Sequence, residues 1–154
     1  MSKVYKFEEK IEMNCSAQKI FDMLKVEKHD VTEVLSHKVP NIQARQGDWC
    51  TLGSTRKWDF IIGEKSTYLI DRLEALDEKN LKLTRSVIEG EMMSYCKTVL
   101  MHAQVIPKGN DDKCCVLKFV MEYEKIDENA PEPKEFFNFG VGVFKELGNH
   151  LSSV

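Results

Sequence analysis

The sequence predicts an α+β domain in which helices pack on one side of an antiparallel sheet. Two patterns of apolar residues lead to this prediction. Between residues 41 and 123, apolar and polar residues alternate in short runs separated by turn signals, which is typical of an antiparallel meander. After residue 133, apolar residues recur every three or four positions, which indicates a long helix. At 154 residues the chain fits a single domain, 1–154.

The first strand is predicted near the N-terminus, where Tyr5, Phe7, Ile11 and Met13 share one apolar face. Glu9 is the one charged residue on that face, and two interpretations of it are open. Surrounded by apolar side chains, its carboxyl group would favour the protonated form and could act as a general acid or base. If the strand bulges or lies partly open, Glu9 instead reaches water or a lysine.

Two short helices are predicted after this strand. Ser16 is a suitable N-cap for the first, whose apolar face carries Ile20 and Leu24. The second covers residues 30–36 and ends before Pro40. The chain then divides into about six strands. The turn signals between them lie at residues 46–53, 62–65, 77–80, 89–91 and 107–113.

A long C-terminal helix with an aromatic face is predicted after Pro133. Gly140 and Gly142 lie inside it, and each costs roughly 1 kcal/mol relative to alanine in a helix. They could provide cavity volume, allow hinge motion, or permit close packing against the sheet. The apolar positions at helical spacing are Phe136, Phe137, Gly140, Val143, Phe144, Leu147 and Leu151.

Composition and charge exclude several classes of function. Hydrophobic residues make up 42% of the chain and charged residues 31%, which is ordinary for a globular domain. The formal net charge is −3 and lysines or arginines never run longer than a pair, so nucleic acid is not an expected partner. No stretch approaches the roughly 20 apolar residues of a membrane span, and the first ten residues contain no apolar run typical of a signal peptide.

The five cysteines are odd in number, and Cys114 and Cys115 are adjacent on one predicted strand. Without a secretion signal we expect a cytoplasmic protein with five free thiols. The sequence has no CxxC pair and no nearby HxxxH, so neither a metal nor another cofactor is expected. It also has no GxSxG, and no nucleophile can be assigned.

Four local strings, together with the order of elements, resemble the major latex proteins. These proteins belong to the birch-pollen-allergen-like, or pathogenesis-related class 10, superfamily. The similarity runs from about residue 3 to residue 151, and Cys50 stands where the family usually has a glycine. The strings are Gln46–Ser54 (QGDWCTLGS), Val87–Met92 (VIEGEM), Val105–Lys108 (VIPK) and Glu122–Lys125 (EYEK).

The resemblance implies a START-like helix-grip fold. In this fold a seven-stranded curved sheet wraps around the long C-terminal helix, and two short helices close the base. An internal hydrophobic cavity of several hundred Å3 is expected between sheet and helix. Members of the superfamily bind steroids, flavonoids, cytokinins or long-chain lipids, and a few relatives catalyse ring closure or isomerisation of plant alkaloids and iridoids.

The family register, combined with strand alternation, gives a set of expected ligand-binding residues. Arg85 is open to a second interpretation, in which it lies hydrated near the cavity mouth because an inward arginine is costly unless it is paired. The expected set is Phe7, Arg56, Trp58, Phe60, Tyr68, Leu83, Arg85, Leu100, His102, Phe119, Met121, Tyr123, Phe137, Val141 and Phe144.

The strand at residues 98–105 has two possible orientations. Periodicity alone sends the row with Thr98, Leu100, His102 and Gln104 to solvent, and Val99, Met101, Ala103 and Val105 to the core. The family register sends the first row into the cavity instead, and we adopt it here. His102 could then donate, accept or transfer a proton beside a ligand.

The leading hypothesis is a carrier that binds a small hydrophobic molecule, with a storage or defence-related role. The alternative is a cofactor-free cyclase or isomerase that uses the same cavity, with His102 or Glu9 as the catalytic residue. A third possibility is a hormone-responsive partner protein, although nothing in the sequence indicates the ligand-gated surface that it would need. We expect a monomer or weak dimer.

Overall fold

The computed structural model describes residues 3–26, 32–48 and 50–152. Residues 32–34 are helical and fall within the second short helix predicted at 30–36, whose first two residues lie outside the described part. The strands are β1 (Val4–Met13), β2 (Asn41–Gln46), β3 (Thr55–Ile62), β4 (Lys65–Asp77), β5 (Lys82–Gly90), β6 (Cys96–Lys108) and β7 (Asp111–Lys125). The helices are α1 (Ala17–Val26), the 3-10 helix η1 (Glu91–Ser94) and α3 (Lys134–Ser152).

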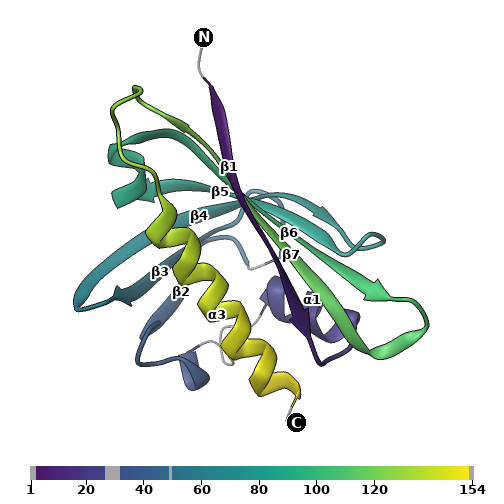
Figure 1. Ribbon diagram of the computed structural model, residues 1–154. Helices are drawn as coiled ribbons and strands as arrows, with labels where there is room; N and C mark the ends of the chain where they lie inside the picture. Colours follow the sequence, from purple (N-terminus) through teal and green to yellow (C-terminus); the bar gives the residue numbers. More distant parts are fainter. Residues whose placement is uncertain (1–2, 27–31, 49, 153–154) are drawn as a thin grey trace.

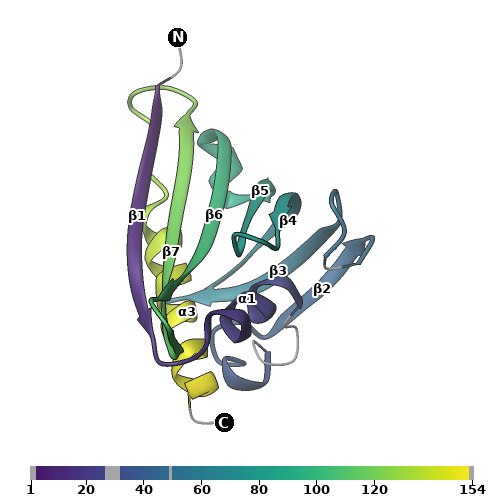
Figure 2. The ribbon, with the colours of Figure 1, turned by 90° about the vertical axis from the view of Figure 1, so that its right-hand side faces the viewer.

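Seven strands form one antiparallel sheet in the order β1-β7-β6-β5-β4-β3-β2. Strands β2 to β7 are neighbours in sequence order, whereas β1 crosses over to pair with β7. The sheet curves around α3, and α1 lies near the same end of the sheet as the C-terminus of α3 (Figure 1, Figure 2). The predicted α+β helix-grip architecture is therefore confirmed.

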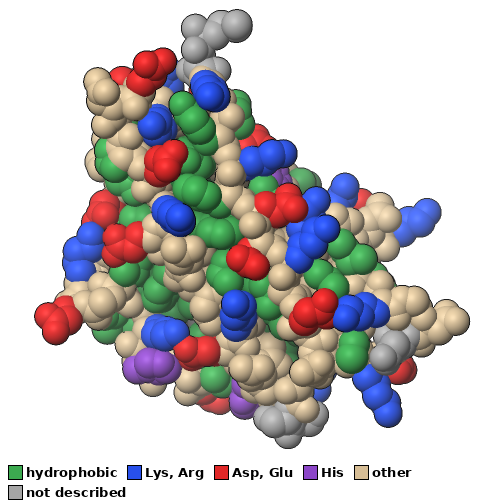
Figure 3. All heavy atoms as spheres, in the orientation of Figure 1, with side chains coloured by type: hydrophobic (Ala, Val, Ile, Leu, Met, Phe, Trp, Pro, Cys, Tyr) green, Lys and Arg blue, Asp and Glu red, His purple; other side chains and the backbone are tan. Residues whose placement is uncertain are grey.

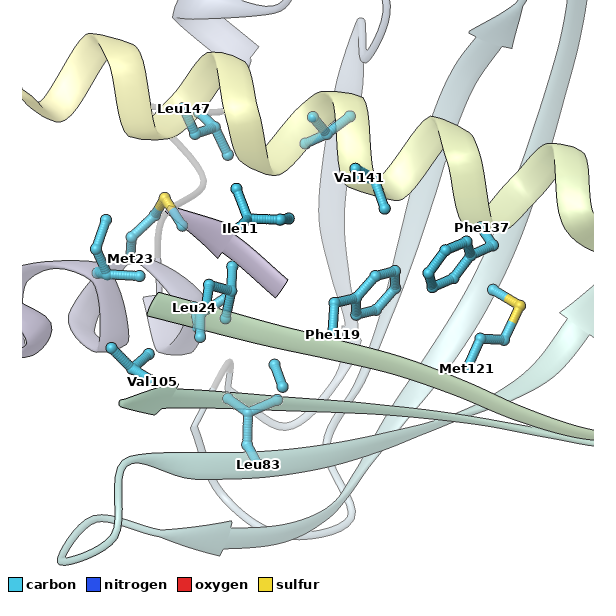
Figure 4. Packing of buried hydrophobic residues seen from close by; sticks show 14 of the residues in the cluster. Ile11, Met23, Leu24, Leu83, Val105, Phe119, Met121, Phe137, Val141 and Leu147 are labelled. Carbon is cyan, nitrogen blue, oxygen red and sulfur yellow. The ribbon is translucent and has the colours of Figure 1, made fainter. Parts of the chain in front are cut away.

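Helix α3 packs on the sheet through an apolar face. In Figure 4, Phe137 and Val141 of the helix point toward Phe119 of β7, and Leu147 points toward Ile11 of β1. All five of these side chains are buried. The core is therefore built from the concave face of the sheet and one side of the helix.

The helix approaches the sheet closely at two glycines. A Cβ atom added at Gly140 would lie 3.1 Å from Cε2 of Phe119, and one added at Gly148 would overlap Sδ of Met13. At Gly142 the nearest such atom is Nζ of Lys38, at 3.8 Å. Close packing therefore accounts for Gly140, whereas Gly142 is not needed for contact with the sheet.

The orientation expected for residues 98–105 is wrong. In β6 the apolar row is buried, with Val99 and Val105 each 1% exposed. Leu100 and His102 lie on the outer face, where His102 pairs across the sheet with Thr84 and Val120. Apolar burial determines which row enters the core, and a register error of one residue reverses every side chain of a strand.

Tyr68 also lies on the outer face, contrary to expectation. It pairs with Asp59 and is 37% exposed, and its hydroxyl donates a hydrogen bond to Glu89 over 3.0 Å. The neighbouring residue Leu69 pairs with Trp58 and takes the inward position. The polar hydroxyl keeps its contact with water and Glu89 while the apolar neighbour is buried.

The surface carries interspersed charges. Figure 3 shows Lys and Arg side chains mixed with Asp and Glu side chains on the face that carries α3. Within the described part of the chain, no helix is long and apolar enough to cross a membrane. The five cysteine thiols are free; Cys115 is buried, and its neighbour Cys114 is partly exposed.

Candidate ligand cavity

A cavity of about 130 Å3 lies between α3 and the concave face of the sheet. Its wall is mostly apolar, with side chains from α1, from strands β2 to β7 and from α3. The volume is smaller than the several hundred Å3 expected from the family. Aromatic rings pack closely at this cavity, where Phe119 stacks on Phe137 at 5.2 Å and meets Phe144 edge-on at 5.0 Å.

Several residues expected to bind a ligand do line this cavity. They come from three strands, β3, β5 and β7, and from the helix, and they converge because alternate residues of each strand face α3. The residues predicted from the sequence that line the cavity are Arg56, Trp58, Phe60, Leu83, Arg85, Phe119, Met121 and Phe144.

Four further predicted residues pack in the core beside the cavity without lining it. Phe7 stacks on Tyr123 at 5.4 Å, and Phe137 and Val141 face β7. The Tyr123 hydroxyl donates a hydrogen bond to Glu132 over 3.1 Å. Burial, together with this bond to a carboxylate, raises the pKa of Tyr123 well above its usual range.

The remaining predicted residues do not reach the cavity. His102, Leu100 and Tyr68 are on the outer face of the sheet. The His102 ring has Nδ1 at 2.8 Å from the Thr84 hydroxyl and Nε2 at 3.6 Å from the Glu122 carboxylate. These groups line an open, mixed-charge depression that is separate from the apolar cavity.

Glu9 lies on the same side of the sheet as Phe119, with which it pairs, but its side chain is exposed. It is therefore not held among apolar side chains. Of the two interpretations of Glu9, the structure supports the one in which the residue reaches water. Neither of the two candidate catalytic residues, His102 and Glu9, lies in the cavity wall.

The side of α3 that faces the cavity is rotated relative to the sequence prediction. Phe136, Phe139, Val143 and Leu147 line the cavity, whereas Phe137 and Val141 pack beside it. The four residues that line the cavity recur at three- and four-residue spacing, so the sequence itself contains this helical pattern. Both sides of the helix are apolar, so spacing alone could not show which side faces a hollow.

One wall of the cavity carries charge. Asp71 on β4 is fully buried and pairs with Arg56 of β3 across the sheet. Nε of Arg56 donates to the two carboxylate oxygens over 3.0 and 3.2 Å, and Nε1 of Trp58 donates to Oδ2 over 3.2 Å. Nη1 of Arg85, from β5, lies 3.8 Å from Oδ1. We call Arg56, Asp71 and Arg85 the charged wall.

Both arginines of the charged wall point inward, and Arg85 is only 3% exposed. Burial, and then the neighbouring guanidinium of Arg56, lowers the pKa of Arg85 to about 9, while Asp71 acts in the opposite direction. Arg85 is therefore positively charged at neutral pH. The hydrated position at the cavity mouth, considered as an alternative for Arg85, does not occur.

Sequence reasoning missed Asp71. One signal was present, because Asp71 interrupts the apolar row of Leu69 and Leu73 on β4. A carboxylate on an apolar strand face normally has a cationic partner. Among the described residues, no group of three or more His, Cys, Asp or Glu side chains is placed to hold a metal ion.

A model of the Pathogenesis-related protein Bet v 1 family matches residues 2–154. MLP-like protein 43 of Arabidopsis thaliana is 33% identical over 151 residues, which cover 97% of this chain and 94% of that protein. MLP-like protein 34 of the same plant is 34% identical over 145 residues, which cover 94% of this chain. The matched part spans 45% of that longer protein.

Solved structures share the fold. A crystal structure of ginseng major latex-like protein 151 from Panax ginseng superposes with a TM-score of 0.87 at 18% identity, covering 96% of this chain and 97% of that one. Norcoclaurine synthase from Thalictrum flavum, in complex with dopamine and hydroxybenzaldehyde, superposes with a TM-score of 0.73 at 17% identity. That match covers 97% of this chain and 89% of the synthase.

Proposed function

Since this chain belongs to the Pathogenesis-related protein Bet v 1 family, we propose that it binds a small apolar molecule in the cavity beneath α3 and carries or stores it. The observation that supports this proposal most directly is the cavity itself, an apolar space of about 130 Å3 between sheet and helix. A void of this kind is costly in a protein core, because its lining loses packing contacts that a bound molecule would restore.

The volume limits what fits without rearrangement. A cavity of similar size, about 150 Å3, accommodates benzene in another protein. Burial of one ring removes roughly 150–250 Å2 of apolar surface from water, which contributes about 4–6 kcal/mol before the costs of association. Since association has its own cost, the dissociation constant for a one-ring molecule should be no tighter than about tens of micromolar. Larger ligands would require movement of the phenylalanine rings.

A cofactor-free cyclase or isomerase is the second candidate, because the fold is shared with norcoclaurine synthase and charged groups lie together at one wall. The geometry favours the carrier. Neither His102 nor Glu9 reaches the cavity, and the oxygens of Asp71 already accept hydrogen bonds from Arg56 and Trp58. Incubation with co-purified metabolites, followed by mass spectrometry, separates the two functions, because only an enzyme converts what it binds.

Binding can be tested with propylbenzene, measured by isothermal titration. Ala103 on β6 is 4% exposed and lines the cavity, so Ala103→Leu should fill part of it and weaken propylbenzene binding by about tenfold or more. Circular dichroism would check that the fold survives this overpacking, which typically costs 1–3 kcal/mol.

Ala75→Leu is a matched control, because Ala75 is exposed and pairs with Thr84 on the outer face. It makes the same chemical change away from the cavity and should leave propylbenzene binding unaltered. No binding to the wild-type protein, or equal losses in the two variants, would overturn the proposal.

A further inference from the structure

One edge of the sheet is long and regular. Strand β1 comes first in the sheet order and pairs with β7 from Val4 to Met13 without a bulge. Among the described residues no strand pairs with its other edge, and β1 runs along the border of the ribbon in Figure 2. The opposite edge strand, β2, is shorter, and its register with β3 shifts between Ala44 and Gln46. Short strands and bulges discourage edge pairing, and β1 has neither feature.

The outer face of β1 carries charges of alternating sign. Lys6, Glu8, Lys10 and Glu12 follow one another on this face, and all four are exposed. Charges on an edge strand normally discourage pairing with another chain. This alternation, however, complements itself in an antiparallel copy. With a two-fold axis at Glu9, Lys6 faces Glu12 of the second copy and Glu8 faces Lys10, and such opposite charges stabilise a strand pair.

The charges also select the register of this pairing. If the axis moves by one residue, to Glu8 or to Lys10, like charges oppose each other: Lys6 then faces Lys10, or Glu8 faces Glu12. Like charges directly opposite are destabilising. A shift of two residues restores unlike pairs but leaves more of β1 without a partner. Only the axis at Glu9 sets unlike charges against each other along nearly the whole strand.

The inner face of β1 fits the same axis except at its centre. Phe7 would face Ile11 of the second copy, which brings two apolar side chains together. Glu9 would face Glu9, and these like charges oppose the pairing. Because Glu9 is exposed, the two carboxylates can turn toward water. One strand pair is also a small interface, so the association should be weak and reversible.

We propose that β1 is a homodimer interface, at which two copies of this chain pair their β1 strands antiparallel about a two-fold axis at Glu9 and join their sheets. The pairing gives the backbone N–H and C=O groups of the free edge hydrogen-bond partners in the second copy. Such an interface is isologous, because each copy contributes the same strand. The inference goes beyond ligand binding and does not depend on it.

Sedimentation equilibrium tests both the dimer and its register. The wild-type protein should show a reversible monomer–dimer equilibrium at concentrations up to about 1 mM, where weak contacts are populated. Glu8→Lys and Lys10→Glu each place like charges opposite each other twice in the dimer. Each variant alone should therefore weaken dimerisation by about tenfold or more.

An equimolar mixture of the two variants should dimerise again. In the mixed dimer the introduced lysine faces the introduced glutamate, and the unchanged Lys10 of one copy faces the unchanged Glu8 of the other. The affinity should return to within about threefold of the wild-type value. The fold should survive, because both positions are exposed and Glu8 loses only a surface ion pair with Lys118, at 3.8 Å. Circular dichroism checks this.

Two further variants complete the test. Glu64→Lys is the matched control, because it makes the same change of charge in the exposed turn between β3 and β4 and should leave dimerisation unaltered. Glu9→Gln removes the like charges at the axis and should tighten the dimer by about two- to fivefold.

Three results would overturn the inference. The first is a wild-type protein that stays monomeric, and the second is a mixture that dimerises no better than its two components. The third is an equal loss in Glu8→Lys and Glu64→Lys, because net charge rather than the pairing of β1 would then control association. A weaker dimer in Glu9→Gln would contradict the position of the axis.

Discussion

His102 cannot contact a molecule in the cavity, because it occupies the outer face of the sheet. Its ring lies between Thr84 and Glu122 on the neighbouring strands, at 2.8 and 3.6 Å. The residues on either side of it, Met101 and Ala103, both line the cavity. Since side chains alternate along a strand, three consecutive residues here serve two opposite faces.

Replacing His102 by alanine should therefore leave the affinity for propylbenzene unchanged. The substitution removes the contact with Thr84 at a partly exposed position, so the free energy of unfolding should fall by about 0.5–1.5 kcal/mol. Isothermal titration and urea unfolding measure these two quantities. Met101→Ala is the matched comparison, because it removes a side chain from the cavity wall and should weaken the binding of propylbenzene. A larger loss of affinity in His102→Ala than in Met101→Ala would contradict the outward orientation.

At the scale of single elements, β6 shows what the sequence determines well and what it does not. Alternation over residues 98–105 correctly separated two rows of side chains. The resemblance to the family then assigned the wrong row to the cavity. Val99 and Val105 are almost fully buried, as hydrophobicity alone would have predicted. An alignment must be correct to a single residue before it can orient a strand, whereas burial acts on every side chain directly.

The sequence correctly predicted where helix α3 begins, since its first residue is Lys134, directly after Pro133. Its role in the cavity was predicted less well. Phe136 and Phe139 line the cavity, whereas Phe137 packs against Phe119. Apolar residues cover two adjacent sides of this helix, because one side meets the sheet and the other meets the hollow. Periodicity records only that both sides are buried.

The glycines of α3 should respond differently to alanine. Gly142→Ala meets no atom closer than 3.8 Å, so the gain in helix propensity should raise the free energy of unfolding by about 0.5–1 kcal/mol. Gly140→Ala has the same intrinsic gain, but its Cβ would lie 3.1 Å from the Phe119 ring, which stacks on Phe137. Its net effect should be smaller or destabilising. Urea unfolding of both variants tests this contrast, and equal stabilisation would show that Phe119 is free to move.

At the scale of the whole molecule, the cavity arises where distant parts of the chain meet. Phe60 of β3 and Phe119 of β7 both contact rings of α3, and their positions set the remaining volume. The charged wall likewise joins three strands, β3, β4 and β5. The family register, combined with strand alternation, placed Arg56 inward and left two interpretations open for Arg85, but the partnership with Asp71 and the cavity volume depend on tertiary packing. Such features are visible only once the sheet has closed around the helix.

Buried acidic groups are also distributed through the molecule. Cys96 on β6 and Cys115 on β7 are 2% and 0% exposed. Burial raises the pKa of each thiol from 9.0 to about 11, with Lys125 acting in the opposite direction at Cys96 and Cys15 adding to the shift at Cys115. The folded protein therefore keeps both thiols protonated at pH values where the unfolded chain would release the protons.

Stability should consequently fall as the pH rises from about 9 through 11. Because the folded-state pKa of each thiol lies above its unfolded value, the contribution is complete below pH 9 and is lost as the pH passes 11. The loss should reach at most roughly 2–3 kcal/mol for each thiol. Urea unfolding between pH 8 and pH 11 measures this slope. Cys115→Ala should flatten it, whereas Cys50→Ala, at an exposed cysteine, should not. A slope unchanged by Cys115→Ala would show that the buried thiol does not contribute to alkaline destabilisation.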